Sequence, residues 1–587
     1  MTRFRLFAIC VGLLLSIDAA SCLGKRPNVI VILTDDQGWG DLSWNGNSNL
    51  STPHIDSLAR DGARLDRFFV CPVCSPTRAE FLTGRYHPRG GVYSTSTGGE
   101  RLDLDERTIA QLFKASGYAT AAFGKWHNGM QYPYHPLARG FNEFYGYCSG
   151  HWGDYFSPQL EHNGELVVGD GYLVDDFTNR AMDFVASNAN RPYFLYLALP
   201  TPHAPMQVPD QFWNRMKDRP LAATARDGDK EDSDFTRAAL AMVESIDANI
   251  GRLLNKLREL QQDEDTIVVF FCDNGPNSYR YNGGMKGKKG STDEGGVRSP
   301  LFIRWPSRIR PGRLVTQIAG AIDLLPTLCD LADIASSPTK PLDGVSLTPL
   351  LLGKTAALPE RMLFSHWNGR VSVRTQHFRL DHRGKLFDML ADPGQTTDVT
   401  SSRPQIADQL RGAADRWKAD LLSGLGEKRR PFTVGHPDFA LTQLPARDAV
   451  ATGGIVRSAS APNCSFYTNW SAADDKISWD IDVLHEGRFE VTMYHTCAET
   501  DVGAEIRLQH GEHSVTTKVQ AAHSPVAVGP EHDRVIRKTQ SPMKDFAPMR
   551  LGVIQLDRGR GDLVLSAEHA ETEMQLEMRL LMLRRVQ

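Results

Sequence analysis

The 587-residue chain has few cysteines, no excess of positive charge, no internal repeat and no low-complexity tract. Nine cysteines are too few for a disulfide scaffold in a chain of this length. A formal net charge of −4 without a basic stripe argues against a nucleic-acid partner. Beyond the opening residues, no stretch is apolar enough to cross a bilayer. The composition, 41% hydrophobic and 23% charged, is that of a globular protein of several domains.

Residues 1–23 have the pattern of a secretory signal peptide. Arg3 and Arg5 precede an apolar run, and small residues follow it. Asp18 cuts that run short of a membrane-spanning length, which weakens the alternative of a transmembrane anchor. Residues 19–22 loosely resemble a lipoprotein cleavage box without its leading Leu, so lipid anchoring is a minor alternative. We expect an exported protein, periplasmic or extracellular, in which Cys464 pairs with Cys497.

Four segments share one plan, in which a continuously apolar strand is followed by polar residues. They are NVIVIL (28–33), YATAAFG (118–124), YFLYLALP (193–200) and DTIVVFFC (265–272). Helical patterns at 105–117 and 235–260 accompany them, which predicts a largely parallel sheet covered on both faces. Ligands of such sheets gather beyond the carboxyl ends of the strands, so we expect the polar residues to converge there.

The remainder of the chain predicts two further units. The α/β domain that contains the four apolar strands is expected to span residues 27–335. Residues 336–428 predict a small α+β subdomain, with short strands, a turn at Arg383-Gly384 and a helix over 405–422. Residues 435–587 alternate at period two, with turn signals such as 485–487, and predict an all-β sandwich.

Two acidic dipeptides follow strands, Asp35-Asp36 and Asp273-Asn274. Three converged carboxylates repel one another unless a cation or protons compensate them. Carboxylate and amide oxygens suit Ca²⁺, or Mg²⁺, better than zinc. The alternative for each dipeptide is that it only caps a helix or turn.

The stretch CPVCSPTRAEFLTGR, residues 71–85, contains a Cys-x-x-Cys pair. We expect Ser75 to cap a helix that Gly84 ends, which places Cys74 where the helix dipole lowers a thiol pKa and Arg78 one turn along. A zinc site would need a second Cys/His pair, and none is evident. A redox dithiol would need a thioredoxin-like setting, which little else in the chain supports. We therefore expect Cys71 to be a small, packed residue beside the site.

Six motifs in order resemble the signature of the sulfatase family, of the alkaline phosphatase superfamily. They are NVIVILTDDQGWGD, CSPTR with TGR behind it, GKWHNG, PTPHAP, FCDNG and KKGSTDEGGVRSP. The resemblance implies a mixed, mostly parallel sheet between helices, and hydrolysis of a sulfate ester. It also implies that Cys74 is oxidised by a maturation enzyme to Cα-formylglycine, whose hydrated aldehyde is the nucleophile.

The resemblance also assigns roles to residues. Asp35, Asp36, Asp273 and Asn274 would hold a divalent ion, usually Ca²⁺, together with residue 74. Arg78 would steady residue 74, and Lys125, His127, His203 and Lys289 would bind sulfate or move protons. The choice of Lys289 over Lys286 and Lys288 rests on its spacing to 294–296. Asn128 and Asp293 depart from the family pattern, which bears on substrate preference.

Other functions stay open from the sequence. A phosphodiesterase or phosphonate monoester hydrolase of the same superfamily would share the metal cluster, and an inactive glycan-binding protein would leave it unused. The β domain resembles carbohydrate-binding modules, which favours a sulfated carbohydrate as substrate. Tyr467, Trp470 and Tyr494 could form its sugar platform, although core packing is the more common role of such residues.

Overall fold

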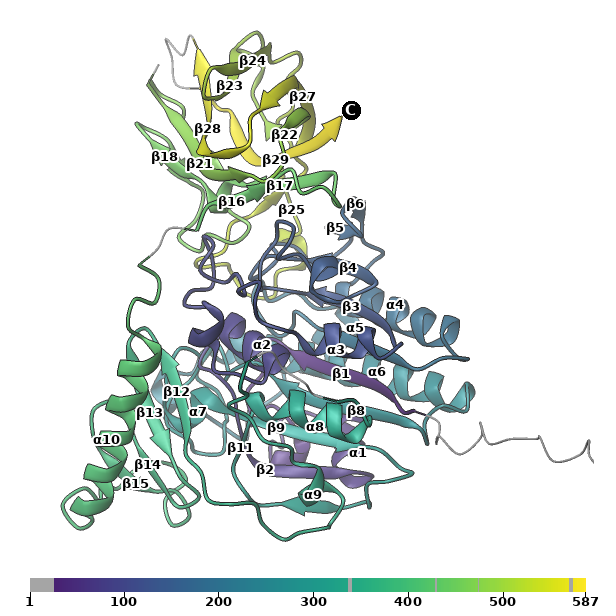
Figure 1. Ribbon diagram of the computed structural model, residues 1–587, viewed down its shortest axis with the longest axis vertical. Coiled ribbons are helices and arrows are strands. Elements are labelled where there is room, and N and C mark those ends of the chain that lie inside the picture. Colours follow the sequence, from purple (N-terminus) through teal and green to yellow (C-terminus); the bar gives the residue numbers. More distant parts are fainter. Residues whose placement is uncertain (1–25, 336–339, 428–429, 473, 569–573, 587) are drawn as a thin grey trace, which may run out of the picture.

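The computed structural model describes residues 26–335, 340–427, 430–472, 474–568 and 574–586. The expected signal peptide lies outside these residues. Figure 1 shows three parts: a large sheet flanked by helices, a small sheet with one long helix at the lower left, and a β domain at the top. Among the described residues, no helix combines the length and the apolarity that a membrane crossing requires.

The large sheet has the strand order β10-β2-β9-β8-β1-β7-β3-β4-β5-β6, and β11 pairs with β2. The four predicted strands are neighbours in it and run parallel. They are β8 (Thr266–Cys272), β1 (Asn28–Thr34), β7 (Tyr193–Ala198) and β3 (Ala119–Lys125), and every residue in them is buried. The prediction of a parallel, doubly covered sheet centre is therefore confirmed. The flanking strands are β2 (Ala63–Phe69), β4 (Glu143–Tyr147), β5 (Gln159–His162), β6 (Glu165–Val168), β9 (Arg298–Arg304), β10 (Arg313–Val315) and β11 (Ala319–Gly320).

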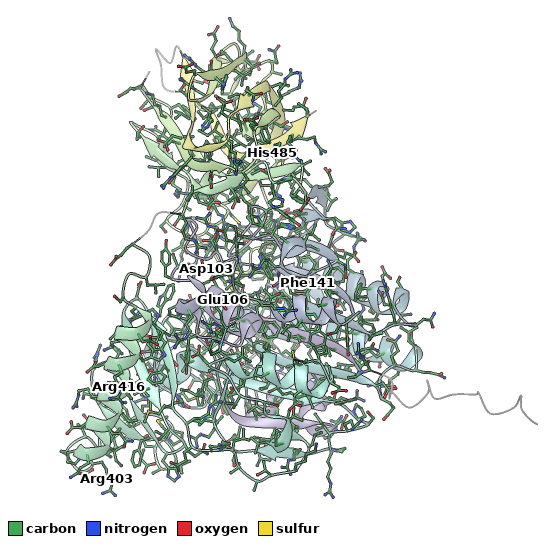
Figure 2. All side chains as sticks on the ribbon, in the orientation of Figure 1. Asp103, Glu106, Phe141, Arg403, Arg416 and His485 are labelled. Carbon is green, nitrogen blue, oxygen red and sulfur yellow. The ribbon has the colours of Figure 1, made fainter. Side chains whose placement is uncertain are left out.

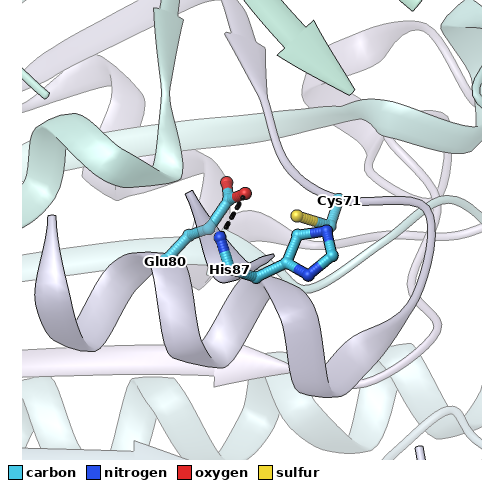
Figure 3. Close-up of side chains that lie close together, drawn as sticks. All are labelled: Cys71, Glu80 and His87. Atoms are coloured by element: carbon cyan, nitrogen blue, oxygen red, sulfur yellow. Dashed lines mark hydrogen bonds between the residues drawn. The ribbon is translucent and has the colours of Figure 1, made fainter. Parts of the chain in front are cut away.

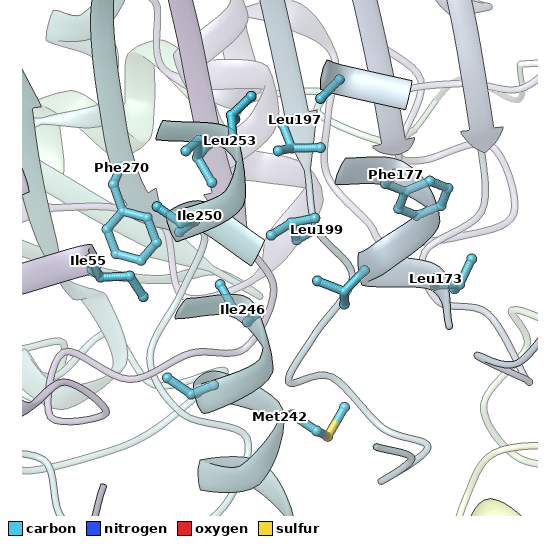
Figure 4. Close-up of a cluster of buried hydrophobic side chains, with 14 of the residues drawn as sticks. Ile55, Leu173, Phe177, Leu197, Leu199, Met242, Ile246, Ile250, Leu253 and Phe270 are labelled. Atoms are coloured by element: carbon cyan, nitrogen blue, oxygen red, sulfur yellow. The ribbon is translucent and has the colours of Figure 1, made fainter. Parts of the chain in front are cut away.

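Alternate residues of β1 point to opposite faces, which builds two cores. Ile30 and Ile32 belong to one core, and Val29, Val31 and Leu33 belong to the other. The first core is packed by α1 (Pro53–Arg60), α4 (Leu173–Ser187), α5 (Asp210–Met216) and α6 (Ser233–Glu259). Figure 4 shows part of it, where Met242, Ile246 and Ile250 of α6 gather with side chains of β7 and β8. The second core is packed by α2 (Cys74–Thr83), α3 (Ile109–Ala115), α8 (Leu324–Leu331) and α9 (Thr348–Leu351).

The predicted α+β subdomain is a four-stranded antiparallel sheet with one helix. Its strands are β12 (Leu363–Trp367), β13 (Arg370–Arg374), β14 (Phe378–Leu380) and β15 (Leu386–Asp388). The helix is α10 (Pro404–Leu421), which buries Leu410, Ala414 and Trp417 against the sheet. In Figure 2, Arg403 and Arg416 mark this helix at the edge of the molecule.

The β domain contains two facing sheets around one hydrophobic core. One sheet contains β16 (Phe432–Val434), β18 (Val450–Thr452), β21 (Lys476–Val483), β23 (Glu505–His510), β24 (His513–Lys518) and β28 (Gly559–Glu568). The other contains β17 (Leu441–Pro445), β19 (Val456–Arg457), β20 (Tyr467–Thr468), β22 (Gly487–Thr496), β27 (Ala547–Leu556) and β29 (Glu577–Val586). The domain begins at Phe432, three residues before the predicted 435, and the expected turn at His485 is labelled in Figure 2.

Trp470 and Tyr467 are buried in the core of the β domain, which is the more common role of such residues, so they do not form an exposed sugar platform. The expected pairing of Cys464 with Cys497 is wrong, because both cysteines are free. The Cys464 thiol contacts the carbonyl oxygen of His151 at 3.0 Å, and the Cys497 thiol contacts that of Ala521 at 3.4 Å, so the two thiols have different partners.

Candidate active site

The polar residues that follow the four central strands converge at one end of the sheet. Asp35 and Asp36 follow β1, and Asp273 and Asn274 follow β8, its parallel neighbour. The backbone amide of Asp36 donates to Asp273 Oδ1 at 3.2 Å, and Asn274 Nδ2 donates to Asp36 Oδ1 at 2.9 Å. The adjacency of β1 and β8 thus joins residues that are more than two hundred positions apart in sequence.

Each of the three carboxylates faces its own cation. Lys125, the last residue of β3, donates to Asp35 at 2.6 Å, and Arg78 donates to Asp273 at 2.9 Å. Lys289 Nζ lies 2.5 Å from Asp36 Oδ1. Burial raises the pKa of Asp36, but the charge of Lys289 and the hydrogen bonds from Asn274 and Lys289 outweigh it and hold that pKa below its usual range. Fixed positive charge that could attract an anionic ligand therefore lies beside the carboxylates.

The donor set suits a hard divalent cation. Asp35 Oδ1 and Asn274 Oδ1 are buried and have no hydrogen-bond partner among the described residues. Ligand atoms of Asp35, Cys74 and Asp273 all lie within 4.8 Å of one another. Burial, followed by the charge of Asp35, raises the pKa of Asp273 to about 6, as expected for carboxylates that need a further cation. These residues fit Ca²⁺ or Mg²⁺.

Cys74 lies at the start of α2, against the same cluster. The helix begins two residues earlier than expected: Val73, not Ser75, is the N-cap, and the Ser75 hydroxyl donates to the carbonyl oxygen of Glu100. Gly84 ends the helix at φ +69°, as predicted. The expected lowering of the thiol pKa is wrong, because burial raises the pKa of Cys74 despite Lys125 and Lys289 nearby. An unmodified thiol here is a poor nucleophile.

Arg78 ties this helix to the strand ends. Besides Asp273, its guanidinium donates to the carbonyl oxygen of Lys125 at 2.8 Å and to the hydroxyl of Tyr196 at 3.3 Å. Its neighbour Thr77 donates to the carbonyl oxygen of Asp273 at 2.5 Å. Arg78 therefore fixes the position of Cys74 relative to β3 and β8 rather than pointing into open space.

The two predicted histidines differ in their surroundings. His203 Nδ1 contacts the carbonyl oxygen of Ala204 and therefore donates to it, which leaves Nε2 free to carry a proton 3.6 Å from Asp36 Oδ2. Burial lowers the pKa of His203 to about 3. His127 Nε2 donates to the carbonyl oxygen of Thr95, and its Nδ1 is buried without a partner among the described residues. Both imidazoles are thus held as single neutral tautomers.

A third histidine was missed by the sequence reasoning. The ring of His151 stacks on that of His203, with centroids 5.4 Å apart and planes inclined by 14°. His151 follows β4, which is itself a parallel neighbour of β3. The rule that polar residues follow parallel strands applies here too, but β4 was not recognised as a strand.

Lys286, Lys288 and Lys289 have different partners. Lys286 lies 3.4 Å from Asp293 and 3.8 Å from Asp381, and Lys288 lies over the ring of Tyr279. Only Lys289 of these three lysines forms an ion pair with Asp36. Asn128 lies beneath α2, where its Nδ2 contacts the backbone oxygen of Ser75 at 3.3 Å, so it supports residue 74 rather than the substrate.

Cys71 belongs to a separate cluster with Glu80 and His87 (Figure 3). The backbone amide of His87 donates to Glu80 Oε1. In the imidazole ring of His87, Nδ1 donates to the carbonyl oxygen of Val92 and Nε2 contacts His366. Burial raises the pKa of Glu80 to about 8 and lowers that of His87 to about 3. Because both ring nitrogens of His87 already have partners, we interpret the cluster as a neutral, hydrogen-bonded group with a structural role next to α2.

A pocket with a volume of about 320 Å³ opens onto the site. Asp36, His203 and Lys289 lie at its inner end, and Phe235, Asn277 and residues 535–540 line its walls. The fold, together with carboxylates, lysines and a helix-borne cysteine at the ends of parallel strands, is that of a hydrolase with the alkaline-phosphatase-like architecture.

Comparison with known proteins specifies the class further. The model of the sulfatase family matches residues 27–334, which is more than half of the chain. A second family model, for the C-terminal part of N-sulphoglucosamine sulphohydrolase, matches residues 288–407. The chain belongs to the sulfatase family and is a sulfuric ester hydrolase.

Individual relatives support the assignment to the sulfatase family. N-acetylgalactosamine-6-sulfatase of Canis lupus familiaris is 33% identical over 378 residues, which are 58% of this chain and 68% of the relative. Arylsulfatase A of Homo sapiens is 34% identical over 447 residues, which are 67% of this chain and 83% of the relative. The crystal structure of Ps i-CgsB in complex with k-i-k-neocarrahexaose matches with a TM-score of 0.62 and 29% identity, over 68% of this chain and 94% of that one.

Proposed function

We propose that this sulfatase hydrolyses sulfate esters of a carbohydrate by means of Cα-formylglycine at position 74 and a bound divalent cation, Ca²⁺ in preference to Mg²⁺. The observation that carries the proposal is the position of Cys74 at the start of α2, with ligand atoms of Asp35 and Asp273 within 4.8 Å of its own. The carbohydrate substrate is supported by similarity to a relative named N-acetylgalactosamine-6-sulfatase and to a structure titled as a complex with neocarrahexaose.

Two groups would complete the site. Once its thiol sulfur is replaced by a carbonyl oxygen, with loss of two hydrogens, residue 74 supplies a hydrated aldehyde, of which one hydroxyl is the nucleophile and the other later expels the sulfate. The cation, held by Asp35, Asp36, Asp273, Asn274 and residue 74, adds positive charge next to that nucleophile. An external maturation enzyme would carry out this oxidation with an oxidant of its own, such as dioxygen, and would remove the sulfur.

The side chains of this protein supply the rest of the chemistry. Negative charge builds on the sulfate oxygens as the ester bond breaks, and the ammonium groups of Lys125 and Lys289, held by Asp35 and Asp36, would stabilise that charge. His203 Nε2 faces the pocket and would protonate the departing sugar oxygen. A bound anionic ester raises the pKa of this imidazole, so the proton is acquired as substrate arrives. His127 Nδ1 carries the lone pair of its neutral tautomer, so it would contact a sulfate oxygen only after gaining a proton.

Mass spectrometry tests the proposed nucleophile. Cleavage by trypsin after Arg67 and Arg78 releases a peptide that contains both Cys71 and Cys74. We expect the aldehyde at position 74 and an intact thiol at position 71 when the protein is made with a maturation enzyme. Sulfate release from 4-nitrophenyl sulfate should accompany the aldehyde and vanish in Cys74→Ala. A fully active protein in which Cys74 carries only a thiol would refute the mechanism.

We also propose export, which rests on the pattern of residues 1–23. Fractionation of a host that produces the full sequence should recover the protein outside the cytoplasm, without its first residues. Recovery of the uncut chain in the cytoplasm would contradict export and leave the catalytic proposal unaffected.

A further inference from the structure

One segment of the β domain forms part of the catalytic pocket. Residues 535–540 line it together with Phe235, Asn277 and the site residues Asp36, His203 and Lys289. The segment lies between β25 (Ala527–Val528) and β26 (Met543–Lys544) of the β domain. The β domain is therefore a structural part of the pocket and not a module attached elsewhere.

Residues just before this segment dock on the catalytic domain. The backbone amide of Arg534 donates to the carbonyl oxygen of Met206 at 2.9 Å, and its guanidinium donates to that of Val208 at 2.7 Å. Gln207 Nε2 in turn donates to Asp533 Oδ1 at 2.9 Å, and Val535 packs against the catalytic core. The segment thus leaves its domain, joins the wall beside His203 and returns.

Arg537 fixes the segment from within. Its Nη1 donates to the carbonyl oxygen of Gly153 in the catalytic domain at 2.6 Å, and its Nε donates to Asp533 Oδ2 at 2.7 Å. The hydrogen bonds of the Arg537 side chain thus hold the segment against the catalytic domain. The position of the pocket wall is therefore set before any ligand binds, which lowers the entropic cost of recognition.

Two side chains of the segment remain largely exposed. Ile536 is 88% exposed and is a large apolar residue at the pocket mouth. The Lys538 side chain is 72% exposed, and its ammonium lies 3.4 Å from Asp232 Oδ2. An exposed ion pair of this length contributes little to stability, so Lys538 can exchange Asp232 for a ligand at small cost. Packing therefore does not account for either side chain.

We propose that residues 535–540 form the subsite for the departing sugar, in which Ile536 contacts a C–H face of the ring and Lys538 binds a second anionic group of the substrate. This inference rests on the proposed function, since it places the leaving group beyond His203. A sugar ring offers apolar C–H faces, and a sulfate or carboxylate on it accepts hydrogen bonds from an ammonium. The subsite thus selects carbohydrate esters with at least two anionic groups over simple aryl esters.

The kinetic test compares substrates. For Lys538→Ala we expect KM to rise about five-fold for D-glucosamine 2-N,6-O-disulfate and for a 6-sulfated hexosamine linked to a uronic acid, with kcat unchanged. KM for 4-nitrophenyl sulfate should not change. A rise for only one of the two sugars identifies the anionic group as sulfate or as carboxylate. Ile536→Ser should raise KM for both sugars by a similar factor, again without an effect on the aryl ester.

Matched controls come from the same domain. Lys518 is 61% exposed and pairs with Glu505 at 3.2 Å on a sheet that does not line the pocket, and Val450 is 65% exposed. Lys518→Ala and Val450→Ser should leave every constant unchanged. Unchanged KM for both sugars in Lys538→Ala and Ile536→Ser would overturn the subsite.

Binding separates this inference from the catalytic proposal. Calorimetry in the Cys74→Ala background should show the same loss of affinity for the two sugars on addition of Lys538→Ala, independently of turnover. If the wild-type protein releases sulfate from no ester, the catalytic proposal fails, while this binding measurement still decides for or against the subsite.

Discussion

The ammonium of Lys125 lies 2.6 Å from Asp35 Oδ2, and neither side chain is exposed to solvent. A buried ion pair is stable only while both partners are present, because either charge alone has lost its hydration without compensation. Lys125 is also the residue at which β3 ends, so the strand delivers the charge directly to the carboxylate. The pair thus links the stability of the sheet to the chemistry of the site.

Removal of this lysine should destabilise the protein. We expect Lys125→Met to lower the free energy of unfolding by about 3–5 kcal/mol, because Asp35 keeps a buried, unpaired charge. The double variant Lys125→Met/Asp35→Asn should recover part of that loss. Thermal unfolding in the presence of a chelator measures both without interference from a bound cation. Equal stability of the single and double variants would contradict the idea that Asp35 keeps a destabilising charge once Lys125 is removed.

A divalent cation should stabilise the folded protein independently of activity. At 100 times its Kd, a ligand that binds only the folded state adds about 2.7 kcal/mol, so Ca²⁺ should raise Tm and a chelator should reverse the effect. Asp36→Asn should abolish the increase because it removes one of the three carboxylates. Asp234→Asn, at an exposed position in the first turn of α6, is the control and should keep it. An equal Ca²⁺ effect in Asp36→Asn would contradict the assigned site.

The first helix of the signature and the ends of the central strands were predictable because each depends on local sequence. The run from Val29 to Leu33 specifies a buried strand, and parallel pairing brings the residues that follow such strands together. His151 escaped because β4 is short and its residues do not form a continuous apolar run. The pocket wall around Ile536 could not be predicted, since it depends on how two domains dock through contacts such as that between Arg537 and Gly153.

Replacement of His203 should affect substrates according to their leaving groups. A sugar alkoxide needs a proton as it departs, whereas 4-nitrophenolate is stable without one. We therefore expect His203→Gln to lower kcat about 10²–10³-fold for a sulfated sugar and less than about 10-fold for 4-nitrophenyl sulfate. His513→Gln, on the exposed surface of the β domain, should change neither value. A uniform loss across both esters would assign His203 to sulfate binding instead.

Glu80 should make stability depend on pH. Burial raises its pKa from 4.5 to about 8 in the folded protein. Below pH 4.5 the carboxyl is protonated in both states and its stabilising effect is complete. Between about pH 5 and 8 only the unfolded state ionises, so stability falls with rising pH by about 1.4 kcal/mol per unit for one proton. Wild-type Glu80 loses a proton on unfolding in this pH range, and Glu80→Gln has no such proton to lose. The variant keeps a side-chain oxygen that accepts from the His87 amide.

The Tm of Glu80→Gln, relative to that of the wild type, should therefore increase steadily from pH 5 to pH 8. The variant has a neutral side chain at this position at every pH. In the wild type, ionisation of Glu80 in the unfolded state increasingly favours unfolding as the pH rises. Glu259→Gln, at the exposed end of α6, should run parallel to the wild type over the same range. A constant difference between Glu80→Gln and wild type would mean that Glu80 is already ionised in the folded protein, and the cluster with His87 would then carry a charge.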